Sequence, residues 1–330
     1  MLTTARRWLH RKCVRPLALG AVRLAAAGVS RYELDDDAHA IFDGRGFHLL
    51  KKHFYLPIPD AADLGEAFWS GQSEMVGVDT NDVYALRLAR EVFPAHLAEF
   101  RELFPLHPPS GDRDKFHLIN GGFMAIDAHV YYCLVRHFKP RRIVEVGAGY
   151  STLVSAAACE RNRAEAGAAP HLTAIDPFPY AFLRRGVPGL SQLIEAKVQD
   201  VSLEQFTSLE SGDIVFIDST HALREGGDVQ YEYCEVLPRL APGVLVHIHD
   251  ISLPKPYPRV YFEKNRLYWN EQYLLQAFLT YNSRFEVVWP GNYLMTKYPD
   301  QVCAVFPEYL VMREAYPMSE PTSFWMRVRP

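Results

Sequence analysis

The sequence is poor in cysteine and has no pair of cysteines at metal-binding or redox spacing. Its five cysteines, at positions 13, 133, 159, 234 and 303, are scattered over 330 residues. Cys133, Cys159 and Cys234 lie within apolar helical patterns, where a buried thiol is common. The sequence therefore predicts no disulfide framework and a protein of a reducing compartment, the cytoplasm.

An overall excess of positive charge is also missing. The net charge is −4, and no basic stripe with interleaved aromatics is present, so we expect no nucleic-acid partner. The basic residues gather instead at the N-terminus, where residues 1–31 contain no acid. The bases there are Arg6, Arg7, Arg11, Lys12, Arg15, Arg23 and Arg31.

A long uninterrupted hydrophobic run is absent as well. The apolar stretch at 16–29 is broken by Arg23, and we expect it to be too short and too charged to span a bilayer. It also lacks the clean apolar centre of a signal peptide. Three interpretations of this basic leader remain open: it is a solvated segment, it forms an amphipathic helix peripheral to a membrane surface, or it directs export.

No internal repeat or low-complexity tract is visible, and the length suits one large domain or two modest ones. A break is expected at Pro108-Pro109-Ser110-Gly111. We therefore expect a basic leader over 1–31, a helical and loop cap region over 32–110, and the main domain over 111–330. The sequence does not determine the oligomeric state.

Short β-branched runs alternate with helical patterns in the main domain, which predicts a doubly wound, mostly parallel α/β sheet. An α-rich extension precedes it, and its helical pattern over 82–104 is interrupted by Pro94, so two helices or one kinked helix are expected. The expected strands cover 141–147, 171–176, 192–198, 213–218, 243–249, 284–289 and 324–328, and the expected helices cover 123–138, 151–163, 179–185, 203–209, 226–240 and 269–282.

The first strand ends in a glycine turn, Glu145-Val-Gly147-Ala-Gly149-Tyr150-Ser151. A strand, a Gly-x-Gly turn and a helix form a cradle for a nucleotide-like ligand. Glu145 would repel a pyrophosphate but suits a cationic amino-acid end. Position 152 is Thr rather than Gly, so the dinucleotide fingerprint is incomplete and a nicotinamide cofactor is disfavoured.

Polar residues follow the other strands, and the carboxyl ends of parallel strands are where such folds bind ligands. Asp176 suits the two ribose hydroxyls, with a helix cap before Pro177 as its alternative. Gln199 and Asp200 could bind an adenine amino group or cap the following helix.

Together these residues resemble the class I S-adenosylmethionine-dependent methyltransferases. The resemblance covers residues 120–290. Within the family, the sequence is most similar to a bacterial branch that has Phe-Ile-Asp-x-x-His (216–221) and His-x-His-Asp (247–250) signatures. It implies a seven-stranded sheet with one antiparallel edge strand. It also implies that S-adenosylmethionine is bound by Glu145, Gly147, Gly149, Tyr150, Ser151, Asp176, Gln199, Asp200 and Asp218.

The resemblance further implies a divalent metal, because Asp218, His249 and Asp250 fall on the metal-ligand positions of catechol and sugar O-methyltransferases. His221 stands where the catechol type carries a lysine base, so we expect Asp218 and His221 to be catalytic, with His221 as general base. A histidine-rich site suits Zn, Fe or Mn better than Mg. Alternatively, His247 and His249 bond a neighbouring loop in the core, and Asp218 contacts the methionine end of the cofactor.

The expected reaction is methyl transfer to a small hydroxylated acceptor, such as a sugar or secondary metabolite, through oxygen. A metal-dependent oxygenase on the same scaffold is the alternative, because fold does not fix chemistry. The candidate acceptor-binding residues are His53, Tyr257, Trp269 and Asn270, each of which could instead be an ordinary packing or turn residue.

Overall fold

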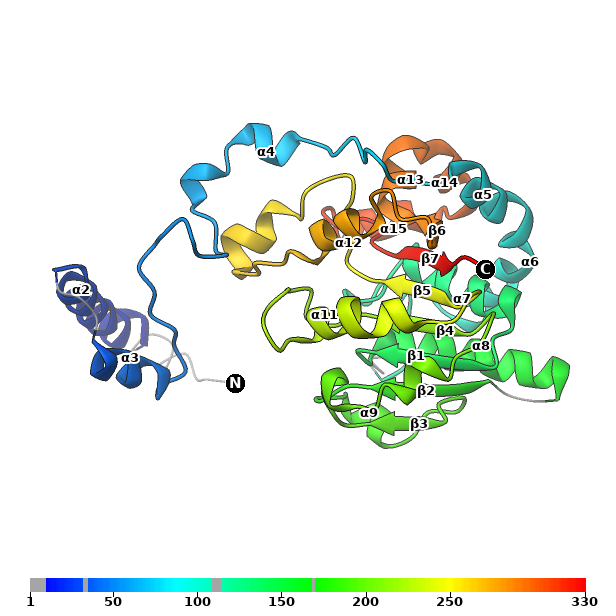
Figure 1. Ribbon diagram of the computed structural model, residues 1–330, viewed down its shortest axis with the longest axis horizontal. Coiled ribbons are helices and arrows are strands. Elements are labelled where there is room, and N and C mark those ends of the chain that lie inside the picture. The colour runs from blue at the N-terminus through cyan, green and yellow to red at the C-terminus, as the bar shows by residue number, and fades with distance from the viewer. Residues whose placement is uncertain (1–9, 32–34, 109–113, 168–169) are drawn as a thin grey trace. The chain divides into compact units, whose positions relative to one another are not determined.

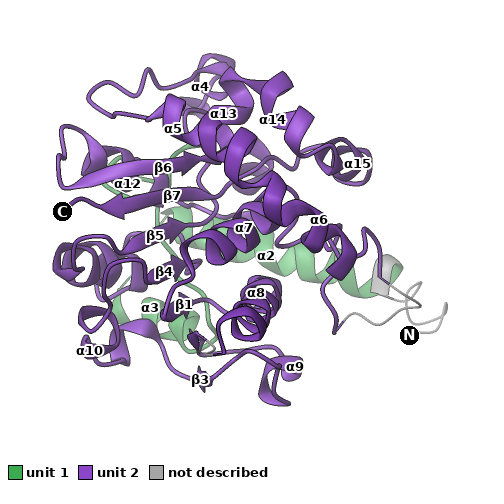
Figure 2. Cartoon of the chain, turned by 90° about the vertical axis from the view of Figure 1, so that its right-hand side faces the viewer, with its two compact units in different colours: residues 1–60 green, residues 61–330 purple. Residues whose placement is uncertain are grey.

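The computed structural model describes residues 10–31, 35–108, 114–167 and 170–330. The chain forms two compact units, Met1–Asp60 and Ala61–Pro330 (Figure 2). Arg6 and Arg7 of the basic leader lie outside the described residues, and so does the expected boundary between residues 110 and 111.

Among its described residues, the first unit has two α-helices, α2 (Arg15–Arg31) and α3 (Asp36–Asp43), with a π-helical turn over His10–Val14 before α2. Helix α2 has no buried residue. By length and composition alone, the helical segment Lys12–Arg31 is able to cross a membrane. The sequence-based expectation of a run too short and too charged is therefore not confirmed, because the helix extends beyond 16–29 at both ends.

The second unit is built on a seven-stranded sheet (Figure 1), as expected, with the order β3-β2-β1-β4-β5-β7-β6. Six strands run in one direction, and β7 is antiparallel to both of its neighbours, β5 and β6. The antiparallel strand therefore lies one place in from the edge rather than at it. The strands are β1 (Arg142–Val146), β2 (His171–Ile175), β3 (Gln192–Ile194), β4 (Ile214–Ile217), β5 (Leu245–Ile248), β6 (Phe285–Pro290) and β7 (Phe324–Val328).

The central strands are buried on both faces, which explains their nearly continuous apolar runs. Along β4, Phe216 faces one hydrophobic core and Val215 faces the other. The first core includes Phe93 and Phe100, so the segment before residue 110 shares its core with the sheet.

Two prolines explain where the expected helices become irregular. The pattern over 82–104 forms α5 (Asp82–Arg87), a π-helical turn (Leu88–Val92) and α6 (Pro94–Leu103), because Pro94 cannot donate a backbone hydrogen bond. The pattern over 226–240 forms α11 (Asp228–Tyr231), a π-helical turn (Glu232–Val236) and a 3-10 turn (Leu237–Arg239) that contains Pro238.

The other expected helices form in the expected order, although α7 begins at Asp127 rather than at 123. They are α7 (Asp127–Phe138), α8 (Tyr150–Ala166), α9 (Ala181–Arg184), α10 (Glu204–Thr207) and α12 (Glu271–Leu279). Four further helices were not predicted from the sequence: α4 (Glu66–Ser70), α13 (Gly291–Lys297), α14 (Pro299–Val305) and α15 (Glu308–Ala315). Short helical turns cover Ala61–Asp63, Val198–Asp200 and Tyr261–Asn265.

Candidate active site

The carboxyl ends of β1, β2, β4 and β5 surround a cavity of about 320 Å³. Polar residues from all four strand ends line it, as the topology of a parallel sheet predicts. The structure thereby brings together Gly147, Gly149, Tyr150, Ser151, Asp176, Asp218, His249 and Asp250. We call this space the cofactor cavity.

The glycine turn after β1 depends on close backbone packing against the end of β4. Gly147 has a φ of 80°, and a Cβ atom built there would lie 2.0 Å from the carbonyl oxygen of Asp218. Only glycine fits both the left-handed conformation and this approach. The turn therefore holds the β1 and β4 ends together at the floor of the cavity.

Asp176 lines the cofactor cavity and also braces the turn beside it. The backbone N–H of Ala148 donates to Oδ2 at 2.9 Å, and that of Phe178 donates to Oδ1 at 2.6 Å. The carboxylate is thus held in one orientation, and each oxygen keeps a lone pair for a further donor. Both roles predicted for Asp176, binding of ribose hydroxyls and capping of the following turn, are compatible with this position.

Glu145 does not line the cofactor cavity, although it stands only two residues before Gly147. Its side chain is fully buried and accepts hydrogen bonds from the hydroxyls of Ser151, Thr152, Ser155 and Tyr131 at 2.7 to 3.1 Å. Burial raises the pKa of Glu145 to about 7, although the four donors lower it. In the structure this carboxylate joins β1 to α7 and α8.

Gln199 and Asp200 lie on a short helical turn and do not line the cofactor cavity. The Nε2 atom of Gln199 donates to the carbonyl oxygen of Gly226 at 3.2 Å. Their predicted role at an adenine amino group therefore stays a prediction.

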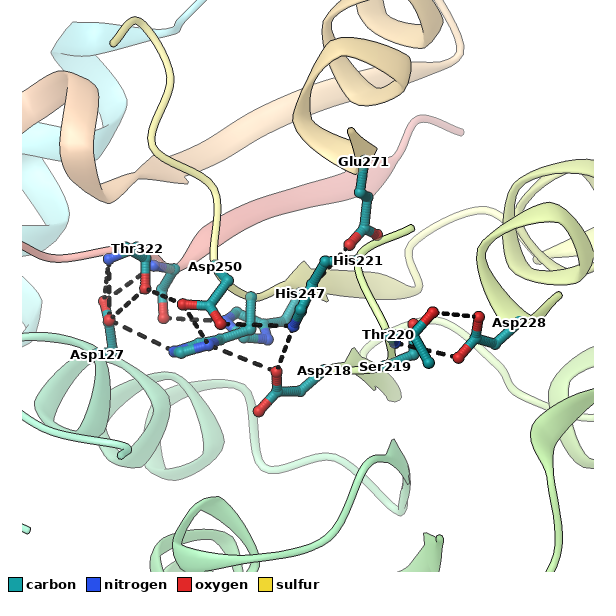
Figure 3. A network of polar contacts seen from close by, with 12 residues as sticks. Asp127, Asp218, Ser219, Thr220, His221, Asp228, His247, Asp250, Glu271 and Thr322 are labelled. Atoms are coloured by element: carbon teal, nitrogen blue, oxygen red, sulfur yellow. Dashed lines mark hydrogen bonds and ion pairs between the residues drawn. The ribbon is translucent and has the colours of Figure 1, made fainter. Parts of the chain in front are cut away.

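His221 stands at the centre of a polar cluster (Figure 3). Its Nδ1 atom lies 2.9 Å from Oε2 of Glu271, and its Nε2 atom lies 3.3 Å from Asp218 and 3.4 Å from Asp250. Burial lowers the pKa of His221, but the surrounding carboxylates outweigh that effect and raise it well above its ordinary value. His221 does not line the cofactor cavity and faces it only through Asp218 and Asp250.

His249 lies on the other side of the same two carboxylates. Its Nδ1 atom is 3.6 Å from Asp218 and from Asp250, and its Nε2 atom is 3.5 Å from Asp127. Neither ring nitrogen has a hydrogen-bond partner among the described residues. Burial lowers the pKa of His249, but the carboxylates raise it to about 9.

His247, by contrast, is a core residue. Its Nε2 atom pairs with the Ser323 hydroxyl at 2.9 Å, and its ring stacks on Phe216 with centroids 4.0 Å apart. Burial lowers the pKa of His247 well below its ordinary value. The alternative of a core histidine bonded to a neighbouring segment therefore describes His247 but not His249.

The donor set suits a divalent cation. Asp218, His221 and Asp250 each offer one ligand atom, and these atoms lie within 4.8 Å of one another. The Nδ1 atom of His221 faces a carboxylate, which is the usual outer partner of a metal-binding histidine. One nitrogen and two carboxylates would suit Mn, Fe or Zn at least as well as Mg.

A second cavity of about 560 Å³ adjoins the first. The two share wall residues that include His249, Asp250 and Tyr261. Tyr257 lines this second space, which we call the acceptor cavity, as do Trp69 and Gln72 from the segment before α5.

The other predicted acceptor residues support the polar cluster or lie elsewhere. Trp269 packs against the His221 ring, with centroids 4.4 Å apart. The N–H of Asn270 donates to the carbonyl oxygen of His221 at 3.0 Å, and its Oδ1 accepts from Leu223. Neither lines the acceptor cavity. His53 belongs to the first unit, where its ring stacks on Phe54.

Three features of the site were missed by sequence reasoning. Glu271, the partner of His221, is fifty positions away and gave no signal beyond its place at a helix start. Asp127 also begins a helix, and its carboxylate accepts hydrogen bonds from the backbone of Thr322 and Ser323. The adjacent glycines at 121–122 line both cavities and were a visible but unused signal.

Comparison with known proteins identifies the family to which this chain belongs. Residues 144–251 match a family model described as Methyltransferase domain. An uncharacterized protein from Archaeoglobus fulgidus is 32% identical over 170 residues, which cover 49% of this chain and 74% of that protein.

Two methyltransferases are among the solved structures with a similar backbone fold. A Podospora anserina methyltransferase bound to S-adenosylhomocysteine (SAH) is 16% identical, with a TM-score of 0.39 over 73% of this chain and 89% of the other. The O-methyltransferase TomG from Streptomyces achromogenes is 15% identical, with a TM-score of 0.36 over 78% and 100%. The chain therefore belongs to the same family as the Archaeoglobus fulgidus protein, and its matched domain makes it an S-adenosylmethionine-dependent methyltransferase.

Proposed function

We propose that this enzyme methylates a hydroxyl oxygen of a small acceptor, such as a sugar or a secondary metabolite. The observation that carries the proposal is the shared wall of the two cavities, formed in part by His249, Asp250 and Tyr261. A cofactor in the smaller cavity and an acceptor in the larger one would meet there. The family match favours methyl transfer over the oxygenase alternative.

When bound, S-adenosylmethionine supplies an electrophilic methyl group on a sulfonium. The acceptor oxygen forms the new C–O bond as the C–S bond breaks, and the hydroxyl proton leaves to a protein group. Holding the two reactants next to each other, where the two cavities adjoin, supplies much of the rate, because it replaces a chance encounter by a fixed geometry.

We further propose that the two histidines exchange the roles expected from the sequence. His221 would bind a divalent cation with Asp218 and Asp250, and the neutral form of His249 would take the acceptor proton. Because the pKa of His249 is raised to about 9, we expect turnover to increase with pH up to about that value. In support, the His221 ligand atom lies close to both carboxylates, whereas His249 lines both cavities and its ring nitrogens are unbonded among the described residues. When bound, the cation would make the acceptor hydroxyl more acidic.

The decisive experiment compares two variants in metal binding and in turnover. His221→Ala should abolish calorimetric binding of Mn²⁺, whereas His249→Ala should keep Mn²⁺ binding and lose SAH formation. His171→Ala is the matched control, because His171 is an exposed histidine at the start of β2.

Each other outcome has a defined meaning. The opposite pattern would restore His249 as the ligand and His221 as the base. Absence of Mn²⁺, Zn²⁺ and Mg²⁺ binding by the wild type would refute the cation, and SAH formation only with amine acceptors would refute oxygen as the target.

We also propose that helix α2 rests on a membrane surface on the cytoplasmic side. Leu17 and Leu24 are 76% and 77% exposed, and Lys12, Arg15 and Arg23 belong to a segment without acids. Apolar and basic side chains on one exposed helix suit an anionic lipid surface.

A further inference from the structure

The acceptor cavity is lined by basic residues, whereas the cofactor cavity is not. Lys255, Arg259 and Arg313 line the acceptor cavity, and no lysine or arginine is among the described residues that line the cofactor cavity. We infer that the acceptor carries an anionic group, a carboxylate or a phosphate, and that Lys255 binds it. This inference rests on the proposed acceptor role of the cavity.

Two of the three cations are already neutralised. Arg259 pairs with Glu263 at 2.7 Å and with Glu66, and Arg313 pairs with Glu320 at 2.7 Å. Neither guanidinium therefore needs a ligand to compensate its charge.

Lys255 is different, because its one ion pair among the described residues is long. Its Nζ atom lies 3.7 Å from Oε1 of Glu320, the same oxygen that accepts from Arg313. Two cations thus share one carboxylate, which leaves a net positive charge and unused ammonium donors on the cavity wall. A carboxylate or phosphate of the acceptor would fill those positions.

The backbone around Lys255 is held in place by Gln272, which is fully buried. The Nε2 atom of Gln272 donates to the Lys255 carbonyl oxygen at 3.1 Å, and its Oε1 accepts from the Ser252 N–H at 2.9 Å. The Lys255 N–H in turn donates to the Ser252 carbonyl oxygen. The backbone that carries Lys255 is therefore fixed, so a ligand would have to order only the side chain of the lysine.

The shared wall differs from the surroundings of Lys255. Asp127 and Asp250 line the acceptor cavity close to His249, so this wall offers carboxylate and imidazole groups that can accept a hydrogen bond from a hydroxyl and, among its described residues, no lysine or arginine. A cavity of about 560 Å³ suits a ligand of one or two rings. The acceptor would then lie with its hydroxyl at the wall and its acidic group at Lys255.

The test uses matched pairs of acidic and neutral probes with the full chain. The probes are 3,4-dihydroxybenzoate and its methyl ester, glucuronate and its methyl ester, and glucose 6-phosphate and glucose. Equilibrium binding is measured in the presence of SAH, and turnover is measured as SAH formation from S-adenosylmethionine. The variants are Lys255→Met and Lys255→Arg, with Lys264→Met as control, because Lys264 is exposed and lines neither cavity.

We expect at least one acid to bind about tenfold or more tightly than its neutral partner, as expected for a charged hydrogen bond. That ratio should disappear in Lys255→Met, return in part in Lys255→Arg and persist in Lys264→Met. The carboxylate and phosphate pairs show which acid is preferred. SAH binding, unchanged in all variants, confirms that they are folded.

Failure of this inference is distinguishable from failure of the proposed function. Equal binding of every acid and its neutral partner, or a preference that survives Lys255→Met, overturns the anionic acceptor while leaving O-methylation intact. A Lys255-dependent preference without SAH formation from any probe supports the anionic site and counts against oxygen methylation of these acceptors.

Discussion

The buried carboxyl group of Glu145 predicts a pH dependence of stability that a single substitution should remove. Burial raises the pKa of Glu145 in the folded chain from its ordinary value of 4.5 to about 7. Between these two values the folded state binds the proton more tightly than the unfolded state does. The free energy of unfolding therefore falls as the pH rises from 4.5 to 7.

The size of the effect follows from the same two values. Each pH unit in that window costs about 1.4 kcal/mol, so ionisation of Glu145 costs the fold roughly 3 kcal/mol in total. Below pH 4.5 the group is protonated in both states and its contribution is fully present. Above pH 7 it is ionised in both, and that contribution is lost. A loss of this size is a large fraction of the stability of an ordinary domain.

The assay is urea unfolding of the wild type and of Glu145→Gln, followed by tryptophan fluorescence at pH 5, 6, 7 and 8. The amide is neutral at every pH, so the wild type should lose stability relative to the variant as the pH rises. Glu160→Gln is the control, because Glu160 lies on α8 and pairs with Arg163 near the surface. A difference between wild type and Glu145→Gln that stays constant across this range would refute the argument.

Further substitutions test the cofactor cavity and the N-terminal helix. Asp176→Ala should weaken S-adenosylmethionine binding by roughly tenfold or more in calorimetry, whereas Glu145→Gln should leave it unchanged; the reverse result would place Glu145 at the cofactor. Gly147→Ala should lower the melting temperature and abolish cofactor binding, since its Cβ would collide with the Asp218 carbonyl. Replacing Lys12 and Arg15 by Glu should reduce sedimentation with phosphatidylserine vesicles; equal sedimentation would contradict surface binding.

The sheet was predictable because its strands are short, apolar and β-branched. Runs such as Ile143-Val144 and Ile214-Val215 are buried on both faces, so their positions follow from composition alone. The end of each strand then follows, and with it the placement of Asp176 and Asp218 in one cavity. Helix boundaries were less predictable: Pro94 and Pro238 indicate an interruption, but the sequence does not specify the π-helical and 3-10 turns that form there.

The orientation of side chains around the cavity was not predictable from position alone. Val144 and Val146 face one core, so the pleat of β1 turns Glu145 to the other face, towards hydroxyl groups of α7 and α8. The serines and threonine at 151, 152 and 155 were the one local signal of this arrangement.

The roles of His221 and Asp250 depend on loop conformations that no sequence pattern specified. Both residues have a left-handed backbone, with φ values of 58° and 54°, which is unfavourable for a side chain with a Cβ. At His221 the start of α12 compensates, because the N–H groups of Asn270 and Glu271 both donate to its carbonyl oxygen.

The first turn of α12 therefore supports the polar cluster. The helix start fixes the His221 backbone through these two donors, and the Glu271 carboxylate fixes its ring. If the larger cavity binds the acceptor, as we propose, acceptor specificity is expected to come from the segments that line that cavity. These are residues 69–72, the loop from Ser252 to Tyr261 and the segment from Met312 to Thr322. Substitutions in those segments should change the choice of acceptor, whereas substitutions at the start of α12 should reduce turnover for every acceptor alike.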